Sequence, residues 1–412
     1  MSKRFFSIFY VTFLIGALLY GSLFIVGPIS VRHVVTIMMF FVCLYNHHKL
    51  YSDSFFKIYL IFIFFFFLSS FMSGYTSEAI RRIIGYYFVS YVGLFSTYIM
   101  VTKYNGEKIF LFTICGIGIL DAVVTMGQIL FIPSINNLVS YLQLDLALKE
   151  EFGLIQGRAD FGLGFGIPGV FGVVANSYYL MVASILSMSA QTKKLSLIGL
   201  LITSFLLVAC FVVQERSSFY LATTFVIILA FVLLTKLFGK FTRLFILFIF
   251  LLLLSLLIDK GADYINSFET RMSDMFSLTG RDAIWANAID YISQYPIFAG
   301  YDRMMSIYHR DAHNLILNAY IFGGLFGFIA IIVLTVRQFI LIAKSCLLRC
   351  KINNLTVMVL SCTFIAYTVN SLVHNFSVVY GTLDIWLVWA CLYSIVKRER
   401  QPYSSNGSYL TQ

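Results

Sequence analysis

The sequence predicts an all-α fold, a polytopic transmembrane helix bundle of about twelve spans with two long loops on the outer side. Of the 412 residues, 60% are hydrophobic and only 12% are charged, whereas a soluble domain carries about 25% charged residues. The mean hydropathy is +0.88. This composition excludes a water-soluble globule, a disordered chain and a nucleic-acid-binding domain. We predict a single integral membrane domain over residues 1–412.

The apolar residues fall into runs of membrane-spanning length. A hydrocarbon core about 30 Å thick is crossed by a helix of about 20 mostly apolar residues. The first run is too long for a signal peptide, and no small-residue cleavage site follows it. The second and ninth runs are the shortest. The predicted spans are 5–26, 33–46, 55–72, 83–101, 109–131, 169–190, 195–213, 218–235, 244–258, 314–336, 355–373 and 380–396.

The distribution of charge predicts that both termini lie in the cytoplasm. With the N-terminus inside, 18 of the 29 Lys and Arg residues fall on the cytoplasmic side, and 14 of the 19 Asp and Glu residues fall outside. Cations accumulate on the cytoplasmic side of membrane proteins. The net charge of +10 is therefore typical of this class and does not indicate a nucleic-acid partner.

Two outer loops are long, 132–168 and 259–313, while the other connections are short. Both long loops contain apolar residues at helical spacing. We expect short amphipathic helices there, which lie on the membrane surface or pack over the bundle. The apolar positions are Ile135, Leu138, Val139 and Leu142 in the first loop and Trp285, Ala288, Ile289 and Ile292 in the second.

Two acidic residues fall inside predicted spans, Asp121 in the fifth and Asp384 near the outer end of the twelfth. Polar groups at membrane depth are candidates for function, but hydrogen bonding between neighbouring helices explains them equally simply. None of the seven cysteines falls in the two long outer loops, and Cys346 and Cys350 have no histidine or second cysteine pair nearby. We therefore expect no disulfide framework, no metal site and no cofactor.

Three arginines stand near helix ends on the outer face, against the general trend: Arg158, Arg216 and Arg281. A guanidinium group binds phosphate oxygens in pairs and keeps its charge, so converging arginines can hold a pyrophosphate. For any single one, snorkelling or a local salt bridge is an adequate explanation, because an acidic residue lies within two positions of each.

His313 stands where the second long loop meets the tenth span. The positive end of a helix dipole disfavours a protonated imidazole, and a neutral histidine can take a proton from an attacking sugar hydroxyl. Asn314 is also a good helix N-cap. Gly323 and Gly327 have the spacing of glycines at close helix contacts, so packing is an alternative explanation for this region.

The spacing of His313 and Asn314 to Gly324 and Gly327 resembles the signature of the bacterial O-antigen ligase and O-antigen polymerase superfamily. The preceding segment is similar as well, with Gly280-Arg281 followed by Trp285, Pro296 and Gly300. The family pattern usually has a second glycine after the position of Gly300, where this chain has Tyr301.

Two further arginine contexts resemble the same family. Arg216 lies in Gln-Glu-Arg-Ser at the outer mouth of a middle span, although Glu215 is less usual there than a small or polar residue. Arg158 precedes a glycine-rich stretch, and Asn176 lies just inside the next span. The twelve-span layout with large outer loops is also similar.

The resemblance implies metal-independent glycosyl transfer from an undecaprenyl-pyrophosphate-linked oligosaccharide at the periplasmic face of the bacterial inner membrane. It implies His313 as the base for the acceptor hydroxyl, and Arg158, Arg216 and Arg281 as pyrophosphate ligands, with Asn314, Gly324 and Gly327 as a supporting motif. The expected partners are this lipid-linked glycan, membrane lipid and a chain-length regulator, and no nucleic acid.

Within the superfamily we favour a polymerase of O-antigen, capsular or exopolysaccharide repeat units, because Phe- and Ile-rich spans and divergent loops vary with each glycan. The alternatives are an O-antigen ligase, which transfers the glycan to lipid A-core, and a lipid-linked oligosaccharide flippase or other transporter. A flippase should carry charges along a central cavity and show two similar halves. This chain has only Asp121 and Asp384 at membrane depth and no internal repeat.

Overall fold

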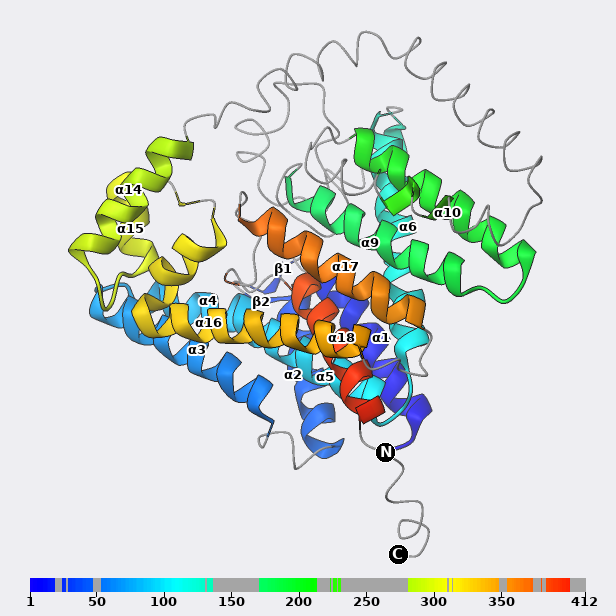
Figure 1. Ribbon diagram of the computed structural model, residues 1–412, viewed down its shortest axis with the longest axis horizontal. Helices are drawn as coiled ribbons and strands as arrows, with labels where there is room; N and C mark the ends of the chain where they lie inside the picture. The colour runs from blue at the N-terminus through cyan, green and yellow to red at the C-terminus, as the bar shows by residue number, and fades with distance from the viewer. Residues whose placement is uncertain are drawn as a thin grey trace, which may run out of the picture. The chain divides into compact units, whose positions relative to one another are not determined.

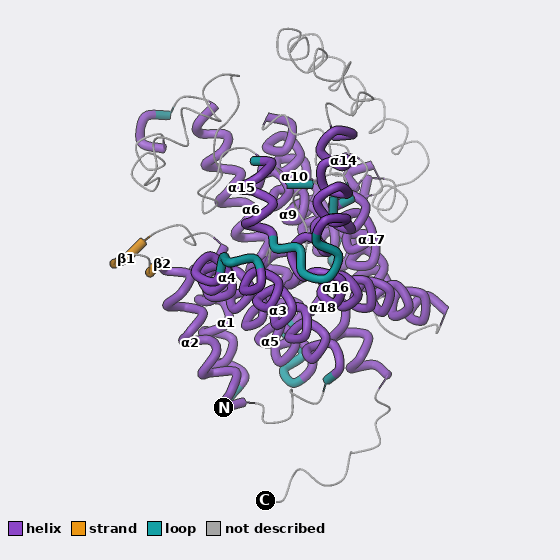
Figure 2. The backbone as a smooth tube through the Cα atoms, turned by 90° about the vertical axis from the view of Figure 1, so that its left-hand side faces the viewer, coloured by secondary structure: helices purple, strands orange, loops and turns teal. Residues whose placement is uncertain are grey.

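The computed structural model describes eleven stretches of the chain and a few isolated positions (223, 225–227, 229–230 and 379). Almost all the described residues are helical, and one pair of short strands accompanies them (Figure 2). The stretches are 1–18, 24–26, 29–46, 53–129, 132–135, 170–212, 281–309, 311–312, 314–347, 354–372 and 383–400.

The chain divides into two compact units, one of residues 1–113 and 287–412 and one of residues 114–286. The first unit contains α1 (Lys3–Leu18), α2 (Val31–Asn46), α3 (Ser54–Met72), α4 (Thr76–Arg82), the π-helix η2 (Ile83–Tyr87), α5 (Phe88–Thr102), α15 (Tyr301–Tyr308), α16 (Leu315–Leu347), α17 (Asn354–Ser371) and α18 (Leu383–Arg400). The second contains α9 (Val170–Ser189) and α10 (Lys193–Val212). Two helices have residues in both units, α6 (Glu107–Ile129) and α14 (Arg281–Gln294).

The helices α3 and α16 form an antiparallel pair in the first unit (Figure 1). Phe66 stacks on Phe322 and Phe65 stacks on Phe326, one turn further along α16. Phe62 lies against Gly323 and Gly327. The order of these contacts runs in opposite directions along the two helices. The contact between α3 and α16 is therefore made by apolar, mostly aromatic, side chains.

A second set of buried aromatic residues holds α18 in the first unit. Trp386 is fully buried against Tyr59 of α3, with ring centroids 4.4 Å apart. Trp389 contacts Trp386 and Phe364 of α17 at 5.1 and 4.9 Å. Offset and edge-to-face ring contacts of this kind add to the free energy gained by burying the rings. The α18 helix therefore lies at the centre of the unit and not at its surface.

The predicted first span, 5–26, is wrong at its end, residues 24–26, which form a strand. Helix α1 ends at Leu18, and Phe24–Val26 (β1) pairs with Ile29–Ser30 (β2) in an antiparallel ribbon. Gly27 and Pro28 separate the two strands in the sequence. Proline lacks the amide hydrogen that a continuing helix needs, and β-branched residues favour strands. The run is apolar enough for a span, but its last two residues are β-branched and are followed directly by Gly27 and Pro28.

Five helical stretches among the described residues are long and apolar enough to cross a membrane. They are Ser54–Met72, Thr76–Thr102, Glu107–Gly127, Lys193–Cys210 and Leu315–Ala343. Helices also lie over the predicted runs 33–46, 169–190, 355–373 and 380–396. The runs 218–235 and 244–258 lie largely or wholly outside the described residues, as does most of the loop 132–168. The count of twelve spans stays a prediction.

The two predicted intramembrane acids are both buried, Asp121 completely and Asp384 to 2% exposure. Asp384 is in the first turn of α18, and one of its carboxylate oxygens has no hydrogen-bond partner among the described residues. The explanation of Asp384 as a hydrogen-bonded link between helices stays a prediction.

Candidate functional site

The segment that follows Arg281 folds into the predicted helix of the second long loop. The helix α14 covers Trp285 to Ile292, with Ala288 and Tyr291 fully buried and Ile289 59% exposed. The Tyr291 hydroxyl lies 2.5 Å from the carbonyl oxygen of Ala299 and 2.8 Å from that of Gly300. Burial raises the pKa of Tyr291, so this hydroxyl stays protonated and acts as a donor. The buried face of α14 is therefore packed against the turn at 299–300.

The turn after α14 is joined to a break in α16. At Gly324 the backbone leaves the helical conformation, with φ +62° and ψ −166°. The amide of Leu325 donates to the carbonyl of Ile297 over 3.1 Å, and the amide of Gly300 donates to the carbonyl of Ile321 over 3.0 Å. We call this contact between 297–300 and 321–325 the Gly324 junction.

Glycine is required at two positions of this region. A Cβ atom on Gly324 would lie 2.1 Å from the carbonyl oxygen of Ile297. Gly300 has φ +87°, and a Cβ there would lie 2.4 Å from the hydroxyl of Ser73, just after α3. Side chains rarely adopt such φ values. Gly300 and Gly324, both part of the family-like pattern, therefore bring the loop against the end of α3 and against the break in α16.

Gly327 has a different position. The nearest atoms to a Cβ on Gly327 or on Gly323 would be those of Phe62 of α3, at 3.6 or 3.5 Å, which is an ordinary contact distance. These two glycines face α3 without being forced to be glycine by their surroundings. They lie in the helix contact that their spacing suggested, but that contact has room for a Cβ at both positions.

The residues on either side of His313 in the sequence are both hydrogen-bonded to the start of α16. The Asn314 side-chain oxygen accepts from the amides of Ile316 and Leu317, at 2.9 and 3.2 Å, so Asn314 caps the helix as predicted. Its amide nitrogen donates to the carbonyl of Leu372 over 3.0 Å. The amide of Ala312 donates to the Asn318 side chain over 3.2 Å, and both residues are fully buried.

An ion pair that the sequence analysis did not identify lies at the same end of α3 and α16. Arg82 donates to Asp302 over 3.0 Å, and the two side chains are 26% and 11% exposed. The Arg82 guanidinium lies 4.5 Å from the centroid of the Tyr301 ring. Arg82 directly precedes η2, and π-helical segments are frequent at functional sites.

Tyr301 and Asp302 stand at the departure from the family pattern, where a second glycine is usual. Tyr301 lies between Arg82 and Phe322, whose ring centroid is 4.2 Å from its own. The side chains that replace the glycine thus join α15 to α4 and to α16. Two features of the sequence could have indicated this pair: the departure from the family pattern at Tyr301 and Asp302, and an arginine, Arg82, on the predicted outer side.

Arg303 is held by neighbouring groups in the same region. Its guanidinium donates to the carbonyl of Met72 over 3.1 Å and lies 4.6 Å from the centroid of the Tyr295 ring. Tyr295 follows α14 and Met72 ends α3. Arg303 therefore has a structural role in joining these elements.

The structure places only part of the predicted site. Arg158, Arg216 and His313 lie outside the described residues. Arg281 begins α14, and its side chain is likewise outside the description. The predicted convergence of the three arginines on His313 stays a prediction. The structure describes the start of α16, its cap at Asn314 and the Gly324 junction, which follow His313 in the sequence or lie before it.

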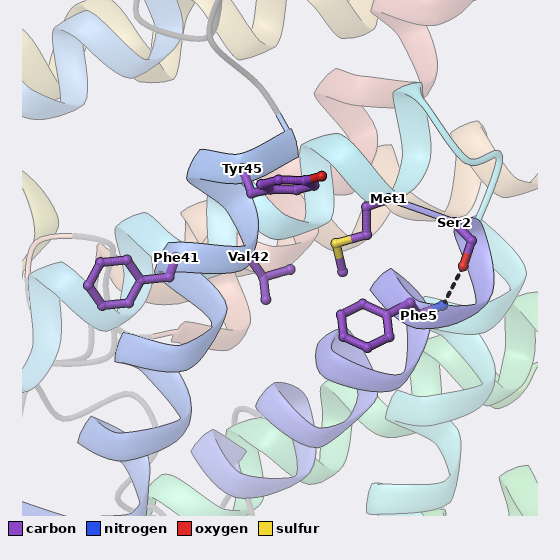
Figure 3. A pocket seen from close by; sticks show the side chains of 6 residues that line it. All are labelled: Met1, Ser2, Phe5, Phe41, Val42 and Tyr45. Atoms are coloured by element: carbon purple, nitrogen blue, oxygen red, sulfur yellow. Dashed lines mark hydrogen bonds between the residues drawn. The ribbon is translucent and has the colours of Figure 1, made fainter.

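Two open grooves of the first unit lie elsewhere. One is lined by Met1, Ser2, Phe5, Phe41, Val42 and Tyr45 (Figure 3). The other is lined by Lys3, Arg4, Ser7, Ile8, Val11, Thr12 and Ile109. Neither includes a predicted site residue.

Among the described residues, no group of three or more His, Cys, Asp and Glu side chains is arranged to hold a metal ion. The raised pKa of Tyr291 is caused mainly by its burial. It therefore does not mark Tyr291 as a catalytic group. The arrangement offers a capped helix start, a buried amide side chain and an Arg–Asp pair around one end of α16. Comparison of the chain with protein-family models and with curated proteins finds no match.

Proposed function

We propose that the chain is a polymerase of lipid-linked polysaccharide repeat units, which acts at the periplasmic face of the bacterial inner membrane. The donor is an undecaprenyl-pyrophosphate-linked glycan, and the acceptor is a hydroxyl of another repeat unit. This proposal rests on the family-like pattern around His313 and on the outer position of its loop. It includes the predicted inner-membrane location with both termini in the cytoplasm.

One observation carries the proposal furthest. Gly300 and Gly324 of the pattern both lie in the Gly324 junction, where each has a positive φ and little room for a Cβ, and Asn314 of the pattern caps the same helix α16. The hydroxyl of Tyr320 in α16 donates to the carbonyl of Pro296, a fourth pattern residue. These structural roles of the pattern residues support the proposal.

The proposed reaction assigns a role to each predicted residue. His313 takes the proton of the acceptor hydroxyl while the hydroxyl oxygen attacks the anomeric carbon of the donor sugar. The bond from that carbon to the pyrophosphate oxygen breaks, and undecaprenyl pyrophosphate leaves with the electron pair. Arg158, Arg216 and Arg281 stabilise the negative charge that develops on the leaving group. The amide of Ala312 and the cap of Asn314 hold the chain on either side of the base.

The test is the glycan pattern of cells that carry His313→Ala. A general base contributes about 10²–10⁴-fold to a rate, so the variant should be present in the membrane at the normal level and leave single repeat units unpolymerised. The measurement is a length ladder of the surface glycan, with an immunoblot for the protein. A full ladder would overturn the assignment of His313 as base.

A matched control is His309→Asn. His309 ends α15 in the left-handed conformation, with φ +54°, which asparagine tolerates. His309→Asn removes an imidazole four positions before His313 and should leave the ladder intact. The same gel separates the alternatives within the superfamily, since a ligase variant would leave no glycan on lipid A-core instead of a single repeat unit. Unchanged transfer together with loss of glycan export would indicate a flippase.

A further inference from the structure

The groove between α1 and the start of α6 is the second of the two open grooves named above, with a volume of about 640 Å³. It lies on the first unit and is formed by one stripe of α1 and by Ile109. The lining combines a basic end with an apolar floor. Its residues are Lys3, Arg4, Ser7, Ile8, Val11, Thr12 and Ile109.

The helix α1 has two distinct faces. Phe6, Tyr10 and Leu14 are fully buried, and the Tyr10 hydroxyl is 2.9 Å from the hydroxyl of Thr97 in α5. On the other face Ile8 is 57% exposed. The groove is therefore on the side of α1 that does not pack into the protein, where a membrane-spanning helix contacts lipid.

The basic end of the groove has no acidic partner in the described residues. Neither Lys3 nor Arg4 forms an ion pair there. The acidic residue nearest in sequence to Ile109 is Glu107, and Glu107 is already paired with Arg398 over 3.0 Å. Arg398 also donates to the carbonyl of Val101. The positive charge of Lys3 and Arg4 is thus available to a ligand.

We infer that this groove binds one anionic phospholipid of the cytoplasmic leaflet. Lys3 and Arg4 contact the phosphate headgroup, and an acyl chain lies over Ile8, Val11 and Ile109. Basic pockets beside apolar helix surfaces on the cytoplasmic side bind acidic lipid headgroups. The inference depends on the predicted cytoplasmic N-terminus and does not depend on the proposed enzymatic function.

The other groove provides a comparison on another side of α1. It lies between α1 and α2, and its lining side chains carry no charge (Figure 3). The Ser2 hydroxyl accepts from the amide of Phe5 and is engaged within α1. This groove can take an acyl chain, but none of its lining side chains can hold an acidic headgroup by charge.

The test is lipid binding by the purified full chain, measured by native mass spectrometry. Phosphatidylglycerol and phosphatidylcholine are added to delipidated protein in separate titrations. The unaltered protein should retain phosphatidylglycerol preferentially. Because a cation near the surface contributes about 1 kcal/mol to the binding of acidic lipid, Lys3→Gln with Arg4→Gln should weaken phosphatidylglycerol binding by about tenfold or more. The binding of phosphatidylcholine should not change.

The matched control is Lys193→Gln with Lys194→Gln. These two lysines occupy the first turn of α10, next to exposed Leu195 and Leu197, and are predicted to lie on the same side of the membrane. Their removal should leave the preference for phosphatidylglycerol intact. Equal losses in the two double variants would show a diffuse effect of surface charge and overturn the site. So would equal retention of the two lipids by the unaltered protein.

A second pair of variants tests the acyl-chain part without changing charge. Val11→Trp fills the basic groove, and Val42→Trp fills the uncharged one; both valines are half-buried. Only Val11→Trp should reduce the binding of phosphatidylglycerol. Both variants should elute from size-exclusion chromatography as the unaltered protein does. Equal effects of the two tryptophans would contradict the inference.

Discussion

The amide of Leu325 donates a hydrogen bond of 3.1 Å to the carbonyl of Ile297, and this contact is made possible by the left-handed backbone of Gly324. It joins the turn after α14 to the middle of a long apolar helix. Inside a regular helix the amide of Leu325 would donate to the carbonyl of Ile321, four residues earlier. Here it donates to Ile297 instead, and the carbonyl of Ile321 accepts from the amide of Gly300. The position of the loop before His313 depends on this break in α16.

The Gly324 junction predicts different effects for two neighbouring glycines. Gly324→Ala should lower the thermal midpoint of the detergent-solubilised protein strongly, because backbone strain alone costs about 1–3 kcal/mol and the new Cβ would meet the Ile297 carbonyl. The new Cβ of Gly327→Ala meets Phe62 and Phe65 at van der Waals distance, so this variant should be neutral or slightly stabilising. Equal midpoints for the two variants would contradict the assigned geometry.

The Arg82–Asp302 pair predicts a coupled effect on stability. Asp302→Asn and Arg82→Gln should each destabilise the protein by about 1–3 kcal/mol, as for hydrogen bonds to partly buried charged groups. The double variant should cost less than the sum, because each single variant leaves one charge without its partner. The measurement is a double-mutant cycle on thermal midpoints. Strict additivity would show that the two side chains do not interact in solution.

Arg82→Lys separates charge from geometry at the same site. Lysine keeps the charge but cannot lie flat on the Tyr301 ring as a guanidinium does. We expect an intermediate midpoint, between those of the unaltered protein and Arg82→Gln. A midpoint equal to that of the unaltered protein would show that Arg82 stabilises the protein through its charge alone.

The pair formed by Asp53 and Lys397 predicts stability that does not change near neutral pH. Burial by itself raises the pKa of Asp53, but hydrogen bonds from Lys397, the Phe55 amide and Tyr393 more than reverse this and lower it. Burial by itself lowers the pKa of Lys397, and the hydrogen bond to Asp53 raises it above the usual value. The two side chains are 2.5 Å apart.

The signs of these shifts determine the pH window. A carboxylate with a lowered folded-state pKa adds stability above its unfolded pKa and loses it as the pH falls through the folded value. A lysine with a raised pKa adds stability below its unfolded pKa and loses it as the pH rises through the folded value. Both groups therefore contribute fully between about pH 4 and pH 10.5.

Asp53→Asn should consequently lower the thermal midpoint by the same amount at pH 6 and pH 8. The expected cost is about 1 kcal/mol, because Lys397 is 31% exposed and water screens the pair. Asp53 also caps α3 by accepting from the Phe55 amide over 2.9 Å, and asparagine preserves that cap. Asp53→Ala should cost about 1 kcal/mol more. A difference between the two pH values would contradict the assigned shifts.

The arginines of the second long loop predict a separation between stability and activity. Arg281→Lys should shorten the glycan ladder with little change in protein level, because a point charge cannot reproduce the bidentate guanidinium. Arg303→Ala should instead lower the thermal midpoint, since it loses contacts to Met72 and Tyr295, and should leave the ladder intact. If the two variants behaved alike, a diffuse electrostatic role would replace the proposed pyrophosphate site.

The charge asymmetry predicts the compartments of the loops. Reporter fusions at residue 290 and near Arg158 should report an outer location, and fusions at both termini a cytoplasmic one. The structure adds a relative constraint, because Asp53 and Met72 mark opposite ends of α3. Residues joined to Met72, such as Arg303, should therefore face the compartment opposite to Asp53 and Lys397. A cytoplasmic reporter signal at residue 290 would rule out the proposed periplasmic chemistry.

The sequence by itself determined the helical class, the approximate positions of most described helices and the cap of α16 at Asn314. These features are local: a run of apolar side chains or a capping asparagine acts on residues within a few positions of itself. The end of α1 at Leu18 was not predicted, because the apolar residues continue to Val26, where Gly27 and Pro28 follow.

The tertiary structure alone decided which distant residues meet. Arg82 and Asp302 are 220 positions apart, and Asp53 and Lys397 are 344 apart. No periodicity of charge or hydropathy specifies such pairs, because they depend on how antiparallel helices bring their ends together. The same reason applies to Gly324: its spacing suggested a motif, but the need for glycine arises from the Ile297 carbonyl packed against it.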